Sequence, residues 1–184
     1  VTMARQDNLN VTQQAAEPII PDTRAGDSVA LLSISRTLQT MVSWDASQPM
    51  DLWDNVVLWD KSMKGCTESN VGRVRSAEFY FFNIKEPLPY EVRYLTAAES
   101  LTFFGNTNTF LLSLELGDDI AQLTQLKRLT IGSYGLTSLP SSLAALKNLE
   151  FLDVGSNNFQ KVPEVLTKEN FPKLRTLILN ANQR

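Results

Sequence analysis

Histidine is absent from this sequence of 184 residues, and cysteine occurs once, at Cys66. Without histidine the chain lacks the commonest general base and the commonest metal ligand. A single cysteine excludes both an internal disulfide and a cysteine-rich zinc site. No apolar run approaches the roughly 20 residues that span a bilayer. The net charge of −3, with both signs mixed along the chain, argues against a nucleic-acid partner.

The sequence also lacks the patterns that accompany catalysis. It contains no nucleophile–base pair, no phosphate-binding glycine loop and no cluster of metal ligands. We therefore expect a protein that is not an enzyme, with no cofactor and no bound metal. The residues that are present, 43% hydrophobic and 20% charged, are those of a folded domain.

A repeated apolar pattern runs from Val74 to the end of the sequence. Its clearest copy, LEFLDVGSNNF at 149–159, reads LxxLxLxxNxL, the signature of a leucine-rich repeat. The other copies start at Val74, Ala98, Leu126 and Leu174. The steps between starts are 24, 28, 23 and 25 residues, and extra residues at 107–116 lengthen the second step.

The spacing within each copy predicts a local structure. Positions 3 to 7 form a short strand, in which the residues at 4 and 6 point inward because side chains alternate along a strand. Three-residue apolar steps between the strands predict short helical or 3-10 turns. An asparagine at position 9, present as Asn106, Asn157 and Asn182, supplies an amide for the backbone of neighbouring turns.

These patterns predict an α/β repeat solenoid of about five leucine-rich repeats. No single repeat can bury its own apolar face, so the copies must stack and place their strands in one parallel, concave sheet. We expect residues 74–184 to form this solenoid without a C-terminal cap. Because the last strand would then be an exposed edge, we expect that the natural chain continues beyond Arg184 or that a partner covers the edge.

Two segments precede the repeats. Residues 1–26 are polar and end in a stretch with proline and glycine, which predicts a disordered tether. Residues 27–73 predict an N-terminal cap that starts with a helix, N-capped by Asp27 and ending near Ser43. A short strand is expected at 56–59.

All three tryptophans, Trp44, Trp53 and Trp59, fall within the predicted cap. A solenoid needs a cover for its first coil, and large aromatic side chains suit that purpose, so we favour a covering role. The alternative is that the tryptophans stack on sugars, which would make the chain a carbohydrate-binding surface protein.

Four motifs follow one another in a familiar order: DSVALL at 27–32, Trp44 and Trp53 followed by a valine, GRV at 72–74, and PLP at 87–89. This order resembles that of bacterial cell-surface leucine-rich repeat proteins of the Bacteroidetes type. Their cap is similar to the plant-type cap of extracellular repeat proteins. Plant relatives staple the cap with paired cysteines, which this sequence lacks.

The resemblance implies an exported protein, extracellular or on the cell surface, and often an outer-membrane lipoprotein. It implies a protein- or peptide-binding module, in one form an accessory lipoprotein of a SusC/SusD-type outer-membrane nutrient importer. The partners would then be a protein or peptide and that transporter complex. A lipid anchor would have to lie outside this sequence, N-terminal to it.

The concave face is the surface on which solenoids usually bind. Positions 3, 5, 7 and 8 point to it, so Tyr80, Phe81 and Phe104 gather at its N-terminal end. An exposed aromatic patch marks a contact site; the alternative is that these rings pack under the cap or under the 107–116 insertion. The predicted partner-binding residues are Glu78, Tyr80, Phe81, Thr102, Phe104, Arg128, Phe151 and Asp153.

Two further features of this face bear on its use. Gly132 and Gly155 predict a flat centre that a partner's backbone can approach. Glu78 and Asp153 are the carboxylates to consider for glycosidase chemistry, but they fall three strands apart, at roughly 14 Å. That separation exceeds the span of about 5 to 9.5 Å between glycosidase carboxylates.

Overall fold

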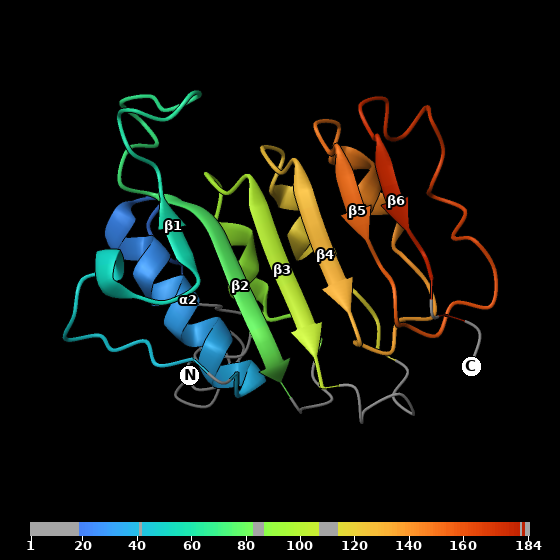
Figure 1. Cartoon of the computed structure of the whole chain (residues 1–184), viewed down its shortest axis with the longest axis horizontal. Helices are drawn as coiled ribbons and strands as arrows, with labels where there is room; N and C mark the ends of the chain where they lie inside the picture. Colours follow the sequence, from blue (N-terminus) through green and yellow to red (C-terminus); the bar gives the residue numbers. More distant parts are fainter. Residues whose placement is uncertain (1–18, 41, 83–86, 107–113, 181, 183–184) are drawn as a thin grey trace, which may run out of the picture.

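One six-stranded sheet, with its strands side by side in chain order, dominates the computed structural model (Figure 1). The structure describes residues 19–40, 42–82, 87–106, 114–180 and 182. The strands are β1 (Val56–Leu58), β2 (Val74–Phe82), β3 (Ser100–Gly105), β4 (Arg128–Gly132), β5 (Phe151–Asp153) and β6 (Thr176–Ile178). β1 is antiparallel to β2, and all later pairs are parallel.

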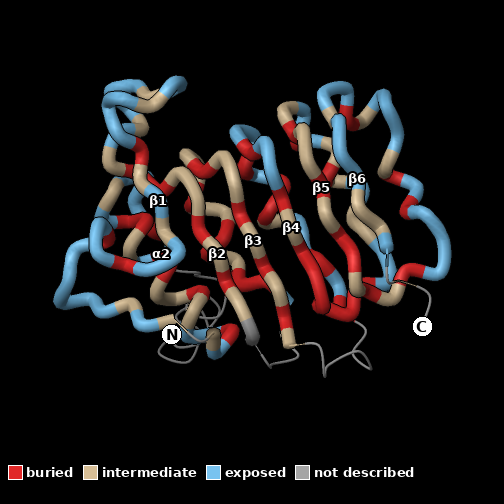
Figure 2. Tube along the Cα trace, viewed as in Figure 1, coloured by how far each residue is buried: buried red, intermediate tan, exposed pale blue. Residues whose placement is uncertain are grey.

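The strand register is the one that the repeat alignment predicts. Position 3 pairs in the order Ser76, Ser100, Arg128, Phe151 and Thr176. In β3, positions 4 and 6 are buried while positions 3, 5 and 7 are partly exposed, so the inward and outward sets alternate (Figure 2). The leucine-rich repeat solenoid is therefore confirmed.

Short 3-10 helices form the side opposite the open face of the sheet. They are η2 (Tyr90–Tyr94), η4 (Asp119–Gln122) and η5 (Ser141–Ala145). Each follows a three-residue apolar spacing, as the sequence predicts. The return between β5 and β6 consists of turns without a helix, in keeping with its irregular spacing. Between these segments and the sheet lies a continuous core of leucines.

The predicted asparagine amides link neighbouring coils. Asn157 is 1% exposed. Its Oδ1 accepts from Tyr134 N at 3.0 Å and from Leu136 N at 3.2 Å. Its Nδ2 donates to Ile131 O at 2.7 Å and to Val154 O at 2.9 Å, so the amide links two coils. Asn182 repeats the arrangement one coil later and accepts from Phe159 N at 3.0 Å. The prediction is confirmed for these two residues.

Helix α2 (Arg24–Leu38) lies against the N-terminal end of the repeats (Figure 1). The prediction that Asp27 caps it was wrong. Thr23 is the N-cap, and its Oγ1 accepts from Gly26 N at 3.1 Å. The helix also ends earlier than the expected Ser43, because the backbone turns into a left-handed conformation immediately after Leu38.

Asp27 instead joins the cap to the first repeat. Its carboxylate is fully buried and accepts from Arg73 Nε at 2.8 Å and from Val74 N at 2.9 Å. The hydrogen bond to Asp27 raises the pKa of Arg73. Arg73 Nη2 also donates to Asp22 Oδ1 at 2.8 Å. A hydrogen bond from Thr96, aided by Arg73, lowers the pKa of Asp22.

The tryptophans pack inside the cap. Trp53 and Trp59 are 5% and 4% exposed. Trp44 stacks on Trp53 with ring centroids 5.6 Å apart and meets Phe79 edge-on at 5.4 Å. Phe79 in turn stacks on Phe103 at 5.0 Å. An aromatic column therefore runs from the cap into β3.

The ends of the described chain differ from the expected domain limits. Residues 1–18 of the predicted tether lie outside the described part, whereas Ile20 is buried and α2 already begins at Arg24. At the other end, Leu177 of β6 is 40% exposed although its neighbour in register, Leu152, is fully buried. No helix in the described residues is long and apolar enough to cross a membrane.

Candidate binding face

The predicted binding residues lie on β2 to β5, on the sheet face opposite the 3-10 helices, called the concave face below. The register sorts them into rows: Arg128 and Phe151 at position 3; Glu78, Thr102 and Asp153 at position 5; Tyr80 and Phe104 at position 7. The side chain of Phe81 lies outside the described part of the structure. Each row crosses the strands at about 4.8 Å per step.

The aromatic row at position 7 does not leave a flat centre on the face. A Cβ added at Gly132 would lie 2.6 Å from Cε2 of Phe104, so that ring rests against the glycine. A Cβ at Gly155 would meet Asn180 Oδ1 at 2.9 Å. Both glycines are buried. The predicted flat approach for a partner's backbone was wrong, because neighbouring side chains lean into the space that glycine leaves.

Tyr80 and Glu78 are engaged with each other. The Tyr80 hydroxyl donates to Glu78 Oε2. This bond, together with partial burial and the nearby negative charge, raises the pKa of Tyr80 to about 12. The phenol therefore stays protonated at neutral pH and acts as a fixed donor to the carboxylate.

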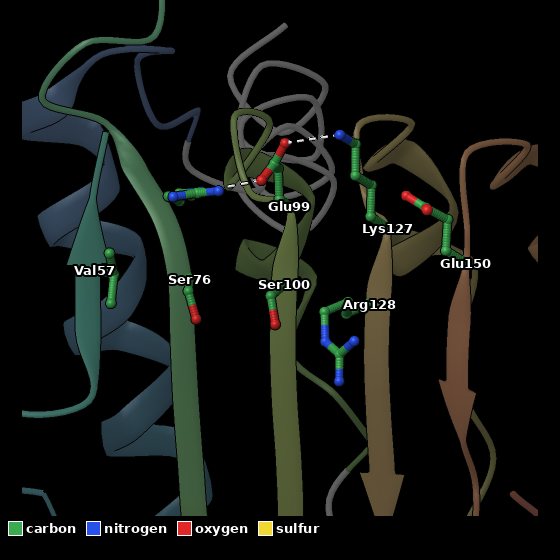
Figure 3. A pocket seen from close by; sticks show the side chains of 8 residues that line it. Val57, Ser76, Glu99, Ser100, Lys127, Arg128 and Glu150 are labelled. Carbon is green, nitrogen blue, oxygen red and sulfur yellow. Dashed lines mark hydrogen bonds and ion pairs between the residues drawn. The ribbon is translucent and has the colours of Figure 1, made fainter. Parts of the chain in front are cut away.

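A groove of about 350 Å³ opens at the start of β2 to β4 (Figure 3). Ser76 and Ser100 form its floor, and Val57 of β1 closes one side. Arg128 stands on the opposite side with its guanidinium carbon 4.1 Å from the ring centroid of Phe151. The rim carries four charged residues: Arg75, Glu99, Lys127 and Glu150.

The rim residues form a charge ladder that the sequence reasoning missed. They occupy position 2 of successive repeats and alternate in sign, and their backbones are linked by hydrogen bonds of 2.8 Å. Glu99 accepts from Arg75 Nε at 3.0 Å and pairs with Lys127 Nζ at 3.2 Å. Position 2 was read as lying outside the strand; reading that column down the aligned repeats would have found the alternation.

The arrangement suits recognition of charged and polar groups. In the part of the chain that the structure describes, no group of three or more His, Cys, Asp or Glu residues could hold a metal ion. Three cations and two carboxylates line the groove. Of these cations, Arg75 and Lys127 share Glu99, whereas Arg128 makes no ion pair with a described residue.

Comparison with known proteins places the fold among extracellular-type repeat domains. No family model matches the sequence. Receptor like protein 28 of Arabidopsis thaliana is 27% identical over 115 residues, or 62% of this chain. The chain spans only 14% of the length of that relative.

Three examples illustrate the solved structures that resemble the chain over 85% of its length. A plant ice-binding protein has 26% identity and a TM-score of 0.67, with 48% of its chain covered. The leucine-rich repeat ectodomain of the Arabidopsis thaliana receptor kinase SOBIR1 has 18% identity and a TM-score of 0.56, with 92% of its chain covered. The structure of PEPR1-AtPEP1 has 22% identity and a TM-score of 0.56, with 21% of its chain covered.

These similarities define the class of the protein: the chain has the fold of a leucine-rich repeat ectodomain. Receptor like protein 28, the ice-binding protein and SOBIR1 are plant proteins. The resemblance to Bacteroidetes-type surface proteins is therefore not supported at the level of bacterial origin.

Proposed function

We propose that this chain is a non-catalytic module that binds a protein or peptide outside the cell through its concave face. The observation that carries the proposal is the contrast between the two sets of strand side chains. The inward set is uniformly apolar, whereas the outward set varies in charge, size and aromaticity from strand to strand and surrounds a groove. Such variety on a rigid scaffold is typical of a recognition surface.

The structural neighbours lend support by analogy. PEPR1 is described together with AtPEP1, and the fold of that chain is similar to this one. At 22% identity the likeness concerns the fold, and one fold hosts many functions. The plant ice-binding protein, which shares the same fold, illustrates this range.

Two finer predictions stand differently. An accessory role beside a SusC/SusD-type importer, with an outer-membrane lipid anchor, rests on the sequence resemblance alone and stays a prediction. The carbohydrate alternative would rest mainly on the half-buried Trp44, since Trp53 and Trp59 are buried and donate their indole N–H groups to backbone oxygens of Asp45 and Ala97.

A displayed random-peptide library, panned against the folded chain, tests the proposal. Thr130 lies at position 5 in the middle of the concave face, and Thr124 is exposed in the turn between η4 and β4. Thr130→Arg should abolish capture of the enriched peptides by placing a bulky charge on the face, while the matched Thr124→Arg variant should retain it. Equal capture by both variants, or no enriched peptide at all, would contradict the proposal.

A further inference from the structure

We infer that the groove at the start of β2 to β4 is a subsite for an acidic side chain of an extended peptide, with Arg128 binding its carboxylate. The inference rests on the proposed function, because it assumes that a peptide occupies the concave face. It adds the chemical character of that peptide and the place where its charge is recognised.

Arg128 is held in position while its charge remains available. The residue is exposed, and its guanidinium carbon lies 4.1 Å from the ring centroid of Phe151, its neighbour in register. Stacking on an aromatic ring uses the face of the guanidinium and leaves its in-plane N–H donors free. These donors match the geometry of a carboxylate, which they can bind with two parallel hydrogen bonds.

The other two cations of the groove are already neutralised. Arg75 donates to Glu99 and lies over the ring of Trp59, with its guanidinium carbon 4.7 Å from the centroid. Lys127 pairs with the second oxygen of Glu99. Glu99 itself is only 17% exposed and engaged on both sides. To reach Glu99, a basic ligand would have to displace one of these cations, whereas an acidic ligand meets Arg128 without breaking an ion pair.

The floor of the groove explains why the hollow lies beside Arg128. Ser100 is its neighbour in register on β3, and Ser76 follows on β2. Both side chains are short, so they leave space where larger residues at position 3 would fill it. Their hydroxyl groups can donate to the same carboxylate. Val57, 44% exposed, offers an apolar contact for the methylenes of the ligand.

The size and charge of the groove limit the ligand to one acidic group on a peptide. A volume of about 350 Å³ lies at the small end of ligand sites. Glu150 flanks the far side and would repel a second anion placed there. A polyanion such as nucleic acid therefore fits poorly, in agreement with the net charge of −3.

The test uses the same displayed peptide library with the complete chain. The enriched peptides should carry Asp or Glu at a recurring position, and their affinity should fall about ten-fold or more on Arg128→Gln. Arg175 is the matched control, because it is an exposed arginine at position 2 of the last repeat, immediately before β6 and outside the groove. Arg175→Gln has the same effect on net charge and should change affinity by less than about two-fold.

A second substitution, in the peptide, completes a double-mutant cycle between Arg128 and the peptide carboxylate. Exchanging the recurring carboxylate for its amide should weaken binding to the wild-type chain as much as Arg128→Gln does, with no further loss when both changes are combined. Enriched peptides without an acidic preference, or with affinity unchanged by Arg128→Gln, would overturn the inference while leaving the proposed function standing. Failure to enrich any peptide would overturn both.

Discussion

The two ends of this solenoid are held together by different kinds of side-chain contact. In the N-terminal region, from α2 to β3, an aromatic column and a buried ion pair join the cap to the first repeats. In the C-terminal region, from β4 to β6, asparagine amides at position 9 bridge successive coils. Burial also differs between the two regions: the inward side chain of Phe79 is fully buried beneath the cap, whereas Leu177 on the last strand is 40% exposed.

This difference follows from what each region has to join. Coils of the C-terminal region are alike, so one asparagine contact repeats along the axis and each coil fits the next. The N-terminal region joins a helix, an antiparallel strand and a parallel coil, which share no repeating geometry. Specific contacts therefore define that joint, and its stability is concentrated in a few residues, whereas the stability of the repeats is spread along the chain.

The largest expected effect comes from interrupting the aromatic column. Phe79 is fully buried between Trp44 and Phe103. Phe79→Ala should lower the free energy of unfolding by about 4 kcal/mol, through lost ring contacts and the cavity left behind. Urea unfolding followed by tryptophan fluorescence measures it. Phe151→Ala is the control in the C-terminal region, where the ring is partly exposed; an equal loss there would remove the distinction between the regions.

Breaking the buried ion pair should be the next largest effect. Asp27→Ala leaves the guanidinium of Arg73, whose side chain is 8% exposed, without its buried partner. We expect a loss of about 3 kcal/mol in the free energy of unfolding. Asp22 pairs with the same arginine, but the Asp22 side chain is 67% exposed. Asp22→Ala should therefore lower the free energy of unfolding much less. If the two variants unfold at the same urea concentration, the buried pair does not hold the cap.

The Asn157 amide of the C-terminal region should contribute less to the free energy of unfolding than the aromatic column or the buried ion pair. Asn157→Ala removes the acceptor of two buried backbone N–H groups, those of Tyr134 and Leu136, for an expected loss of about 2 kcal/mol. Asn148→Ala is the matched control, because that amide bonds Thr124 O and Lys173 at the surface. A loss at Asn157 greater than at Phe79 would reverse the proposed ranking of the regions.

The smallest expected effect is a pH dependence on the concave face of β2. The pKa of Tyr80 is raised to about 12 in the folded chain from the ordinary value of 10.0. The folded state holds this proton more tightly, so the stabilisation is complete below pH 10 and is lost as the pH rises through 12. Phenolate absorbance should show that Tyr80→Phe removes a titration step near pH 12. Loss of a step near pH 10 instead would show that Glu78 does not hold the hydroxyl.

The sequence predicted which residues share the concave face, but not how their side chains lie on it. Positions 3, 5 and 7 of the copies are neighbours in the sheet as predicted, because repeat spacing and side-chain alternation fix them locally. Position 2 was overlooked, although its alternating charges are visible in the aligned repeats. The resting place of Phe104 on Gly132 could not be read from the sequence, since rotamers depend on the space that other strands leave.

Asp27 shows the same limit within the cap. Its place before an apolar helical pattern favours an N-cap, and local propensity permits that choice. The structure assigns the cap to Thr23 and gives Asp27 to Arg73, a residue 46 positions away along the chain. A buried carboxylate requires a compensating charge, and only the folded chain brings one to it.

The sequence by itself determined the solenoid, the strand register and the residues that share each row, because apolar spacing and the two-residue period of a strand act within each repeat. The tertiary structure alone decided which charges are neutralised. Arg75 and Lys127 both reach Glu99, while Arg128 turns to Phe151 and keeps its charge open to the groove. Ion pairing depends on side-chain reach between strands, and that reach is set only when the repeats are stacked.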